Sequence, residues 1–353
     1  MNKPRVLMIG PGRDVMGGVS AVVNNYYASG LDKMTQLRYL STMEDGSKPK
    51  KLAVAVRAYF VFGRLLKDYD IIHIHMAAYA SFDRKALFVK KAYRAGKKII
   101  IHQHGGDFDR YLAQDVDEKQ LRKIIDTFAM CDKLVVLSEE WAAFFSEHGL
   151  CDPKKIVVLH NGVIMPAYER TDYSDHRILM LGRLVEKKGA FDLIKAMPEV
   201  TRAIPDAVLY LAGDGEIERC RSMAAAGGIQ EHIQFLGWIR EKEKEAYLKK
   251  CSVFILPSYH EGMPISLLEA MSYSMASICT DVGGVPRVIK PDTNGILIKP
   301  GDIGAIAGAL IGMLSDEEKK ERIGRAGRDC VKDHFDFSKI TQQLLLLYRE
   351  MTA

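Results

Sequence analysis

Short apolar runs rich in β-branched residues alternate with helical stretches along nearly the whole chain, in two successive series. Such alternation is typical of βαβ units, in which parallel strands form a sheet covered by helices. The chain has 353 residues, enough for two domains with separate cores. It is therefore predicted to be an α/β protein of two doubly wound, Rossmann-like domains. The predicted strands are Arg5–Ile9, Ile71–His75, Ile99–Gln103 and Lys133–Leu137, then Arg177–Leu181, Ala207–Ala212, Ile233–Phe235, Val253–Leu256, Ser277–Thr280 and Gly295–Ile298.

The two series are separated by the segment LHNGVIMP, which ends at Pro166, and by a polar stretch that continues to His176. Its glycine, proline and asparagine are typical of a linker. We place the boundary near Pro166, so the domains are predicted to span residues 1–165 and 166–336. Residues 337–353 have apolar side chains at helical spacing and are predicted to form a helix that packs back across the first domain.

The composition is that of a soluble globular protein, with 48% hydrophobic and 27% charged residues. Its apolar runs are too short or too interrupted to span a membrane, and the N-terminal run Val6–Ile9 is too short for a signal peptide. We therefore expect a cytoplasmic protein. The six cysteines contain no C-x-x-C pair, so they are expected to be reduced and mostly buried.

Positive charge is concentrated in the first half. Between Lys48 and Lys98 there are 13 basic and 3 acidic residues. Two helices are expected there, Lys51–Lys67 and Arg84–Ala95, and such a surface suits an anionic membrane or a lipid-diphosphate acceptor. Ordinary helices with solvated lysines explain the pattern equally well. Nucleic acid is not expected, because no recognised binding motif accompanies the charge. The basic residues are Lys50, Arg57 and Arg64 on one stripe, and Lys85, Lys90, Lys91 and Arg94 on the second helix.

The segment EGMPISLLEAM, from Glu261 to Met271, follows a predicted strand and the loop PSYH. Pro264 suits the first turn of a helix, which would place Glu261 on the preceding loop and Glu269 in the second turn. Exposed N–H groups at a helix start bind phosphate, while carboxylates on either side accept hydrogen bonds from hydroxyls. A nucleotide sugar offers this combination. An ordinary helix with solvated glutamates remains the alternative.

Two further loops are expected at the ligand-binding edge of a sheet. The loop from Gly182 to Gly189 carries Arg183 and Lys188, which can neutralise two phosphates without a metal, although loop cations are often merely solvated. Gly17 and Gly18 precede a helix and permit close approach of a ligand, with a plain turn as the alternative. The glycine spacing there matches neither G-x-G-x-x-G nor the P-loop, which disfavours dinucleotide dehydrogenases and P-loop enzymes.

Taken in order, these elements resemble the retaining family 4 glycosyltransferases of the GT-B fold, over essentially the whole chain. The resemblance implies two Rossmann-like domains facing a central cleft, with the acceptor on the first and the sugar-nucleotide donor on the second. The E-x7-E spacing of Glu261 and Glu269 is its most specific part. The matching elements are Gly17-Gly18, His104-Gly105, Asn161-Gly162-Val163, Gly182-Arg183 with Lys188-Gly189, Gly213-Asp214-Gly215, Phe235-Leu236-Gly237, Pro257-Ser258, Glu261 through Glu269, Gly283-Gly284 and Asn294-Gly295.

By that resemblance, Arg183 and Lys188 hold the donor diphosphate, Glu261 contacts the transferred sugar, and Glu269 binds the ribose. His104 would lie near the reacting carbon. Met263 stands where the family often has phenylalanine, which should alter pocket shape more than chemistry. The resemblance implies metal-independent transfer, so neither a metal nor a cofactor is expected. The remaining donor contacts are assigned to Gly17, Gly18, Gly262, Met263, Pro264 and Ile265.

Histidine pairs suggest a different chemistry. His73 and His75, and likewise His102 and His104, each place two imidazoles on one face of a predicted strand, as metal ligands would be. A metallohydrolase with such a site is therefore a competing hypothesis. Beyond Asp107 and Asp109, no acidic group stands out to complete the site, so His75 and His102 are expected to be hydrogen-bonded strand residues without a metal.

The favoured hypothesis is a retaining glycosyltransferase that moves a hexose or N-acetylhexosamine from a nucleoside diphosphate sugar, with a UDP-sugar expected, to a hydroxyl of a glycan or lipid-linked acceptor. A nucleotide-sugar epimerase of the same fold is a rival, and it would change the sugar of the donor without any acceptor. A binding module that retains a nucleotide pocket but catalyses nothing is another. Peripheral association with the inner face of the plasma membrane is a separate hypothesis, based on the basic segment.

Overall fold

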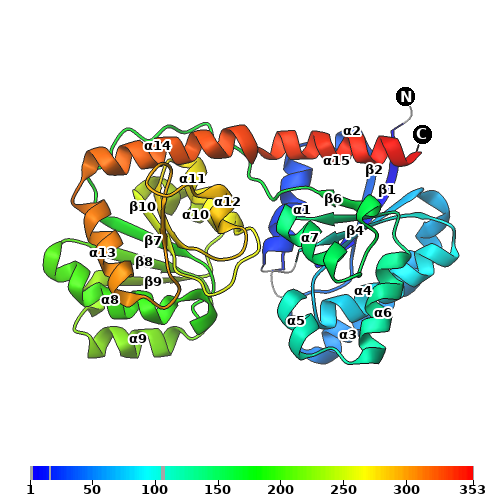
Figure 1. The fold of residues 1–353 in the computed structure, drawn as a ribbon, viewed down its shortest axis with the longest axis horizontal. Helices are drawn as coiled ribbons and strands as arrows, with labels where there is room; N and C mark the ends of the chain where they lie inside the picture. Colours follow the sequence, from blue (N-terminus) through cyan, green and yellow to red (C-terminus); the bar gives the residue numbers. More distant parts are fainter. Residues whose placement is uncertain (1–2, 16, 105–107, 353) are drawn as a thin grey trace. The chain divides into compact units, whose positions relative to one another are not determined.

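The computed structural model describes residues 3–15, 17–104 and 108–352. The chain divides into two compact units (Figure 1). The first unit contains Met1–Ile164 and Phe337–Ala353, and the second contains Met165–Asp336. Each unit is a parallel sheet with helices on both faces, as the alternating pattern predicts, and each is described separately below.

The sheet of the first unit has the strand order β2-β1-β3-β4-β5-β6, with every neighbouring pair parallel. Two of these strands, β2 and β6, were not expected from the sequence. Both lie at the edges of the sheet, where one neighbour is missing and the apolar pattern is weaker. The bounds are β1 Arg5–Gly10, β2 Gln36–Ser41, β3 Ile71–Met76, β4 Lys98–Gln103, β5 Lys133–Val136 and β6 Ile156–Val158.

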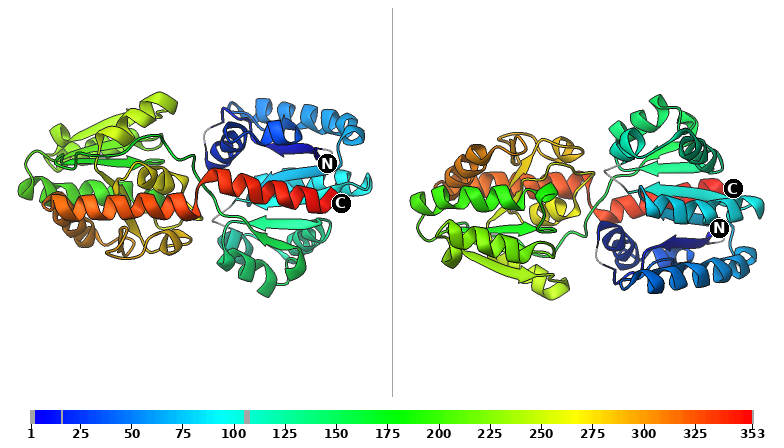
Figure 2. Two further views of the ribbon diagram at one scale, coloured as in Figure 1. Left: turned by 90° about the horizontal axis from the view of Figure 1, so that it is seen from above. Right: turned by 90° about the horizontal axis from the view of Figure 1, so that it is seen from below.

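Helices cover this sheet on both faces (Figure 1). One face packs against a core that includes Phe62, Phe82 and Phe88. Across the other face lies the C-terminal helix α15 (Figure 2), whose Tyr348 is hydrogen-bonded to His73 of β3. The helices are α1 Gly18–Ala28, α2 Leu31–Met34, α3 Lys48–Leu65, α4 Ala80–Arg94, α5 Phe108–Gln114, α6 Glu118–Ala129, α7 Glu139–Glu147 and α15 Phe337–Thr352.

The second unit repeats the architecture with the strand order β12-β11-β10-β7-β8-β9. All six of its strands were expected; β7 and β10 have the predicted ends, and the other four differ by one or two residues. The strands are β7 Arg177–Leu181, β8 Val208–Ala212, β9 Ile233–Gly237, β10 Val253–Leu256, β11 Ala276–Thr280 and β12 Ile296–Ile298. The helices are α8 Ala190–Ala203, α9 Ile217–Ala226, α10 Glu241–Lys250, α11 Ile265–Ser272, α12 Val285–Val288, α13 Ile303–Leu314 and α14 Glu317–His334.

Each sheet contains one point where the strand order reverses. In the first unit this point lies between β1 and β3, because the chain passes from β1 to β2 on one side and then to β3 on the other. In the second unit it lies between β7 and β10. At such a point the loops after the two strands diverge and leave a crevice at the carboxyl ends, where α/β proteins bind ligands. The loops that follow β1, β3, β7 and β10 are therefore the expected ligand-binding segments.

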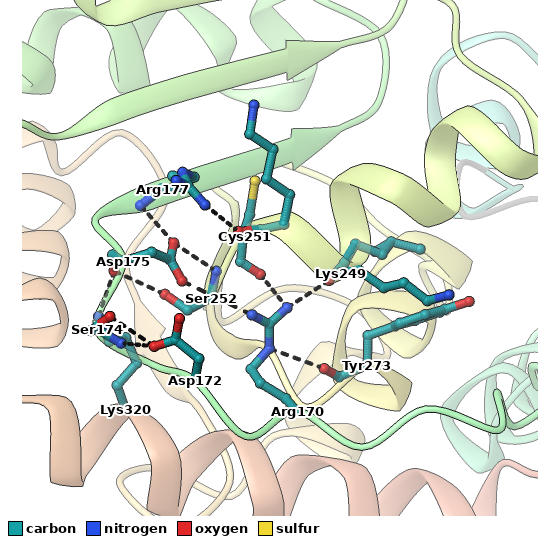
Figure 3. A network of polar contacts seen from close by, with 12 residues as sticks. Arg170, Asp172, Ser174, Asp175, Arg177, Lys249, Cys251, Ser252, Tyr273 and Lys320 are labelled. Atoms are coloured by element: carbon teal, nitrogen blue, oxygen red, sulfur yellow. Dashed lines mark hydrogen bonds and ion pairs between the residues drawn. The ribbon is translucent and has the colours of Figure 1, made fainter.

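The polar stretch before His176 is not a free linker. Arg170 is 3% exposed, and its guanidinium donates hydrogen bonds to the carbonyl oxygens of Leu248 at 2.7 Å and Cys251 at 2.6 Å (Figure 3). The carboxylate of Asp175 accepts a hydrogen bond from the backbone N–H of Ser252 at 3.2 Å. These contacts fix the stretch to the edge of the second sheet opposite the ligand-binding edge.

Candidate active site

The centre of the site in the second unit is an ion pair between two loops. Lys188 follows β7 and Glu261 follows β10, and the lysine Nζ lies 2.6 Å from the Oε1 of Glu261. The same carboxylate oxygen accepts a hydrogen bond from Ser258 Oγ at 2.7 Å. The Glu261 side chain is only 8% exposed and the Lys188 side chain 27%. The fold thus brings together two residues assigned from the sequence to the diphosphate and the sugar, at the strand-order reversal.

Close backbone packing holds these loops in place. Gly189 has φ +69°, and a Cβ atom there would lie 2.0 Å from the carbonyl oxygen of Pro257. A Cβ atom on Gly283, where φ is +53°, would lie 1.7 Å from the carbonyl oxygen of Glu261. Its neighbour Gly284 donates a hydrogen bond to the carbonyl oxygen of Gly262 at 2.7 Å. Only glycine fits at both positive-φ positions, so the backbone of Glu261 is positioned by residues far away in sequence.

The helix α11 presents its N-terminus beside the ion pair. Pro264 occupies the N-cap position, with φ −72° and ψ 114°, and the helix begins at Ile265. The expectation that Pro264 lies within the first turn was therefore wrong by one residue, because its ψ is extended. No side chain caps this helix and no acidic residue lies in its first turn, so its first N–H groups remain available to an anion. Met263 is 5% exposed and packs inward.

Glu269 projects from the second turn of α11, as expected. Its Oε1 lies 2.5 Å from the Nζ of Lys244 on α10. Their side chains are 21% and 31% exposed, respectively. Lys244 was not predicted to belong to the site. Lys244 lies in the charged run EKEKE, which matches no motif. Only its contact with Glu269 places it at the candidate site.

Arg183 is a largely exposed candidate donor ligand. Its side chain is 63% exposed and its Nε lies 3.3 Å from Asp214 Oδ1. The turn that carries Asp214 is joined to the Arg183 loop, because the Leu184 N–H donates to the carbonyl oxygen of Asp214 at 2.6 Å. A weak, solvated ion pair of this kind releases its arginine to a ligand at little cost.

In the first unit, Gly17 and Gly18 lie at the start of α1. Gly17 has φ +146°, and a Cβ atom there would meet no atom within 4 Å. No side chain caps α1, so this N-terminus is also open to a ligand. Of the elements noted in the sequence, Gly105 and Asp107 lie outside the described residues.

Four histidines form a stack at the carboxyl edge of the first sheet. Nδ1 of His75 lies 2.7 Å from Nε2 of His104, and Nε2 of His73 lies 3.2 Å from Nδ1 of His102. Burial lowers the pKa of His73 and of His104 to about 3, and lowers those of His75 and His102 well below the usual value. All four rings are therefore neutral at pH 7.

This stack bears on the metal hypothesis. The ligand atoms of His73, His75 and His102 lie within 4.8 Å of one another, close enough to surround a single metal ion. Each ring is nevertheless hydrogen-bonded at least once. The expectation that His75 and His102 are satisfied holds at one nitrogen only, because the Nε2 atom of each lacks a partner within the described structure.

The basic helices α3 and α4 pack together, and their exposed faces carry both apolar and basic side chains. Lys91 of α4 donates a hydrogen bond to the carbonyl oxygen of Tyr59 of α3 at 3.0 Å. Leu52 is 66%, Val56 48% and Phe60 64% exposed, one helical turn apart along α3. Within the described parts of the chain, no helix is long and apolar enough to cross a membrane.

One residue predicted to lie on this basic surface is elsewhere. Lys85 is only 1% exposed. The apolar stripe of α4 runs through Phe82, Lys85 and Val89 at spacings of three and four, so the inward face of the helix includes the lysine. Helical spacing counted from Phe82 would have revealed this.

Comparison with known proteins agrees with this geometry. A model described as "Glycosyltransferase Family 4" matches residues 31–165, and one described as "Glycosyl transferases group 1" matches residues 169–329. The chain is 30% identical over 304 residues to the phosphatidyl-myo-inositol mannosyltransferase of Mycobacterium tuberculosis, covering 81% of this chain and 75% of that protein. It is 28% identical over 313 residues to the UDP-Gal:alpha-D-GlcNAc-diphosphoundecaprenol alpha-1,3-galactosyltransferase of Escherichia coli, covering 82% and 78%.

Among solved structures, the chain is similar to HepE from Anabaena in complex with UDP-glucose. The TM-score is 0.80, with 16% sequence identity, and the match covers 98% of this chain and 99% of that one. This likeness establishes the fold as GT-B, while the relatives establish the class of enzyme. The matched families and these relatives include neither epimerases nor hydrolases. The chain is a glycosyltransferase and belongs to the family 4 group of the GT-B fold.

Proposed function

We propose that the protein transfers a hexose or N-acetylhexosamine, with retention at the anomeric carbon, from a UDP-sugar to a hydroxyl of a lipid-linked or glycan acceptor. The observation that carries the proposal is the meeting of Lys188, Glu261 and the uncapped start of α11 at the strand-order reversal. A diphosphate with hydroxyl groups on both sides matches one cation, the N–H groups at a helix start, and the carboxylates of Glu261 and Glu269.

In this proposal the donor rearranges the local ion pairs. Lys188 and Arg183 neutralise the diphosphate as it leaves, and the N–H groups of Gly262 and Ile265 assist. Freed from Lys188, Glu261 accepts hydrogen bonds from sugar hydroxyls. Glu269 binds the ribose, and Lys244 orients its carboxylate.

Retention follows from the chemistry of the side chains assigned to the site. None of the residues assigned there is placed as a covalent nucleophile. Stabilisation by Lys188 and Arg183 of the diphosphate as it leaves the anomeric carbon favours attack from the same face through an ion-pair transition state. His104 takes part as a neutral imidazole near the reacting carbon, and its Nδ1 remains available to a substrate hydroxyl because Nε2 is bonded to His75. Because Lys188 and Arg183 supply the positive charge, transfer is proposed to need no bound metal.

The test compares charge-removing variants with exposed controls. Lys188→Ala and Glu269→Ala should weaken UDP binding by about 10-fold or more, since each loses a charged hydrogen bond to the ligand. Arg202→Ala on α8 and Glu231→Ala after α9 remove exposed charges and should bind UDP normally. Unchanged binding in the first two variants would refute the site.

Product analysis then separates the remaining hypotheses. Transfer to an acceptor with an unchanged anomeric configuration, measured by proton NMR and insensitive to EDTA, is expected. A new sugar epimer formed without acceptor would indicate an epimerase. Donor binding with no transfer across lipid-linked and glycan acceptors would indicate a binding module.

We propose that the first unit, which would bind the acceptor, associates with a membrane surface. The two relatives act, by their names, on phosphatidyl-myo-inositol and a diphosphoundecaprenol-linked sugar. The exposed stripe of Leu52, Val56 and Phe60 beside Arg57 and Arg64 combines apolar anchors with cations, as interfacial helices do. Phe60→Ser should reduce sedimentation with vesicles of 30% phosphatidylglycerol, whereas Leu346→Ser on α15, also exposed, should not. Equal sedimentation of the two would remove this proposal.

A further inference from the structure

The first unit contains a pocket that the donor chemistry does not use. It lies between the start of α4, helix α5 and the first turns of α6, and its volume is about 730 Å³. Pockets that bind small molecules typically measure about 300–1,000 Å³. Since α4 follows β3 and α5 follows β4, the pocket lies toward the carboxyl ends of these strands. His104 follows β4 at the same edge, so the pocket is on the side of the sheet where the acceptor is expected.

Two tyrosine rings line the pocket side by side. The ring centroids of Tyr79 and Tyr111 are 4.6 Å apart, with an angle of 52° between the planes. Tyr111 is 4% exposed and packs edge-on against Phe108 at 5.6 Å, and its hydroxyl accepts a hydrogen bond from Nε2 of Gln120 at 2.6 Å. Tyr79 leans on this fixed ring and is itself 40% exposed. The pocket therefore presents a supported aromatic surface, which suits the apolar face of a ligand ring.

The backbone of Tyr79 adopts a conformation that favours glycine. Its φ is 57° and its ψ is −136°, at the residue before the first turn of α4. A tyrosine there carries backbone strain, yet its side chain does not cap the helix and its ring is not buried. Strained residues of this kind are concentrated at ligand sites, where the surrounding structure holds them in place. The conformation thus agrees with a binding role for the ring.

The rest of the pocket offers hydrogen-bonding groups of both kinds. Asp115 supplies carboxylate oxygens and Lys119 supplies ammonium N–H groups, and both side chains are exposed. Gln120 donates from Nε2 to Oδ1 of Asp83 at 3.0 Å and to the hydroxyl of Tyr111. Both contacts use the same nitrogen, so the Oε1 of Gln120 remains an acceptor for a ligand. Acceptors and donors therefore surround the tyrosine rings.

This combination discriminates between classes of ligand. A phosphate would be repelled by the carboxylates of Asp83, Asp115 and Asp117, which all line the pocket. A hydrocarbon chain would cover these charges without bonding them, which is unfavourable. A sugar ring has an apolar face of C–H groups and a rim of hydroxyl groups, each of which both donates and accepts. It matches a tyrosine surface surrounded by carboxylates, an amide and an ammonium.

We propose that this pocket binds a sugar ring of the acceptor, packed on Tyr79 and hydrogen-bonded to Asp115, Lys119 and Gln120. The inference rests on the proposed function, because it commits the acceptor to a molecule that already carries a sugar. The ring bound here is distinct from the transferred sugar, whose proposed site belongs to the second unit.

The experiment uses the methyl glycosides of glucose, galactose, mannose and N-acetylglucosamine as probes. Their binding is measured by ligand-observed NMR with UDP present at saturation. At least one glycoside should bind to the wild type, and neither inorganic phosphate nor n-octanol should displace it. Binding of none of the four would overturn the proposal. Displacement by phosphate would identify an anion site, and displacement by octanol would identify a lipid site; either would overturn it as well.

Two variants locate the bound glycoside. Tyr79→Gly removes the aromatic surface and should weaken binding by about 10-fold, and Asp115→Ala should weaken it several-fold. Tyr93→Ala on α4 and Asp126→Ala on α6 change an exposed ring and an exposed carboxylate outside the pocket, and both should bind like the wild type. Wild-type affinity in both pocket variants would overturn the proposal. Glycine adopts this φ without strain, so Tyr79→Gly should fold; if it does not, Asp115→Ala decides the outcome.

Failure of this inference is distinguishable from failure of the proposed function. UDP binding is measured on the same preparations, and neither pocket variant changes the donor site. Intact UDP binding without glycoside binding would reject the pocket alone, while absence of UDP binding in the wild type would reject the donor site. Glu261→Gln should leave glycoside binding unchanged; loss of binding in that variant would place the glycoside in the donor site and overturn the proposal.

Discussion

Gly283 packs against the backbone of Glu261, and this contact gives the assignment of Glu261 a sharp test. Substitution by alanine would place a Cβ atom 1.7 Å from the Glu261 carbonyl oxygen. To reach an acceptable contact, the Glu261 backbone must move by more than about 1 Å, and misplacement on that scale costs about 100-fold in turnover. The left-handed φ of +53° adds a backbone penalty of about 1–2 kcal/mol.

Gly228 provides the matched control. Its φ is +66°, but a Cβ atom there would meet nothing within 4 Å. Gly228→Ala should therefore lose about 1 kcal/mol of unfolding free energy and keep its turnover. Urea unfolding and sugar transfer are measured for both variants. If Gly283→Ala retained the turnover of Gly228→Ala, the carbonyl contact would not position Glu261 and the reasoning would be refuted.

Two further predictions concern stability. Arg170→Ala leaves two buried carbonyl groups without donors and should lower the unfolding free energy of the second unit by about 3 kcal/mol, whereas Arg177→Ala, at an exposed position, should lower it by less than about 1 kcal/mol; equal effects in urea unfolding would contradict this account. The lowered pKa values of His73 and His104, about 3 each, mean that the unfolded chain binds more protons than the folded one between pH 6.5 and 3. Stability should therefore fall by about 2 kcal/mol per histidine as the pH decreases from 6.5 to 5, and a first unit equally stable at pH 7 and pH 5 would count against burial of neutral rings.

The sequence predicts the fold well where strands are buried on both sides and poorly at the edges. The central strand β10, VFIL, is a continuous apolar run, and β3, IIHIHM, is buried along its whole length; both were predicted. β2, with the sequence QLRYLS, mixes exposed and half-buried positions, and β6 has only three residues. Neither length nor pattern distinguishes such edges from loops, because their pairing is decided by the neighbouring strand.

Most residues of the candidate site were predicted from the sequence, but their contacts with one another were not. Lys188 and Glu261 were both assigned to the donor, although nothing in the sequence shows that they pair with each other across 73 positions. Lys244 was missed because its partner Glu269 is supplied by a different helix. Lys85 was predicted to lie on the surface from its charge alone, although its spacing from Phe82 and Val89 places it on the buried face of α4. Contacts between elements depend on packing, which local patterns do not encode.

Because Lys188 and Glu261 form an ion pair, removal of one charge also changes how the other affects UDP binding. Glu261 is 8% exposed, so in Lys188→Ala its carboxylate is left without a cation and repels the incoming diphosphate. Lys188→Ala therefore loses the attraction between Lys188 and the diphosphate, and it also leaves the negative charge of Glu261 uncompensated. In the double variant Lys188→Ala/Glu261→Gln the repulsion is absent, and UDP affinity should recover about 10-fold relative to Lys188→Ala, since coupled neighbours deviate from additivity by about 1–2 kcal/mol. Glu261→Gln alone frees Lys188 and should bind UDP at least as tightly as the wild type, while sugar transfer falls. A double variant that binds UDP no better than Lys188→Ala would show that the two groups act independently, and the diphosphate would then have to be held elsewhere along the loop.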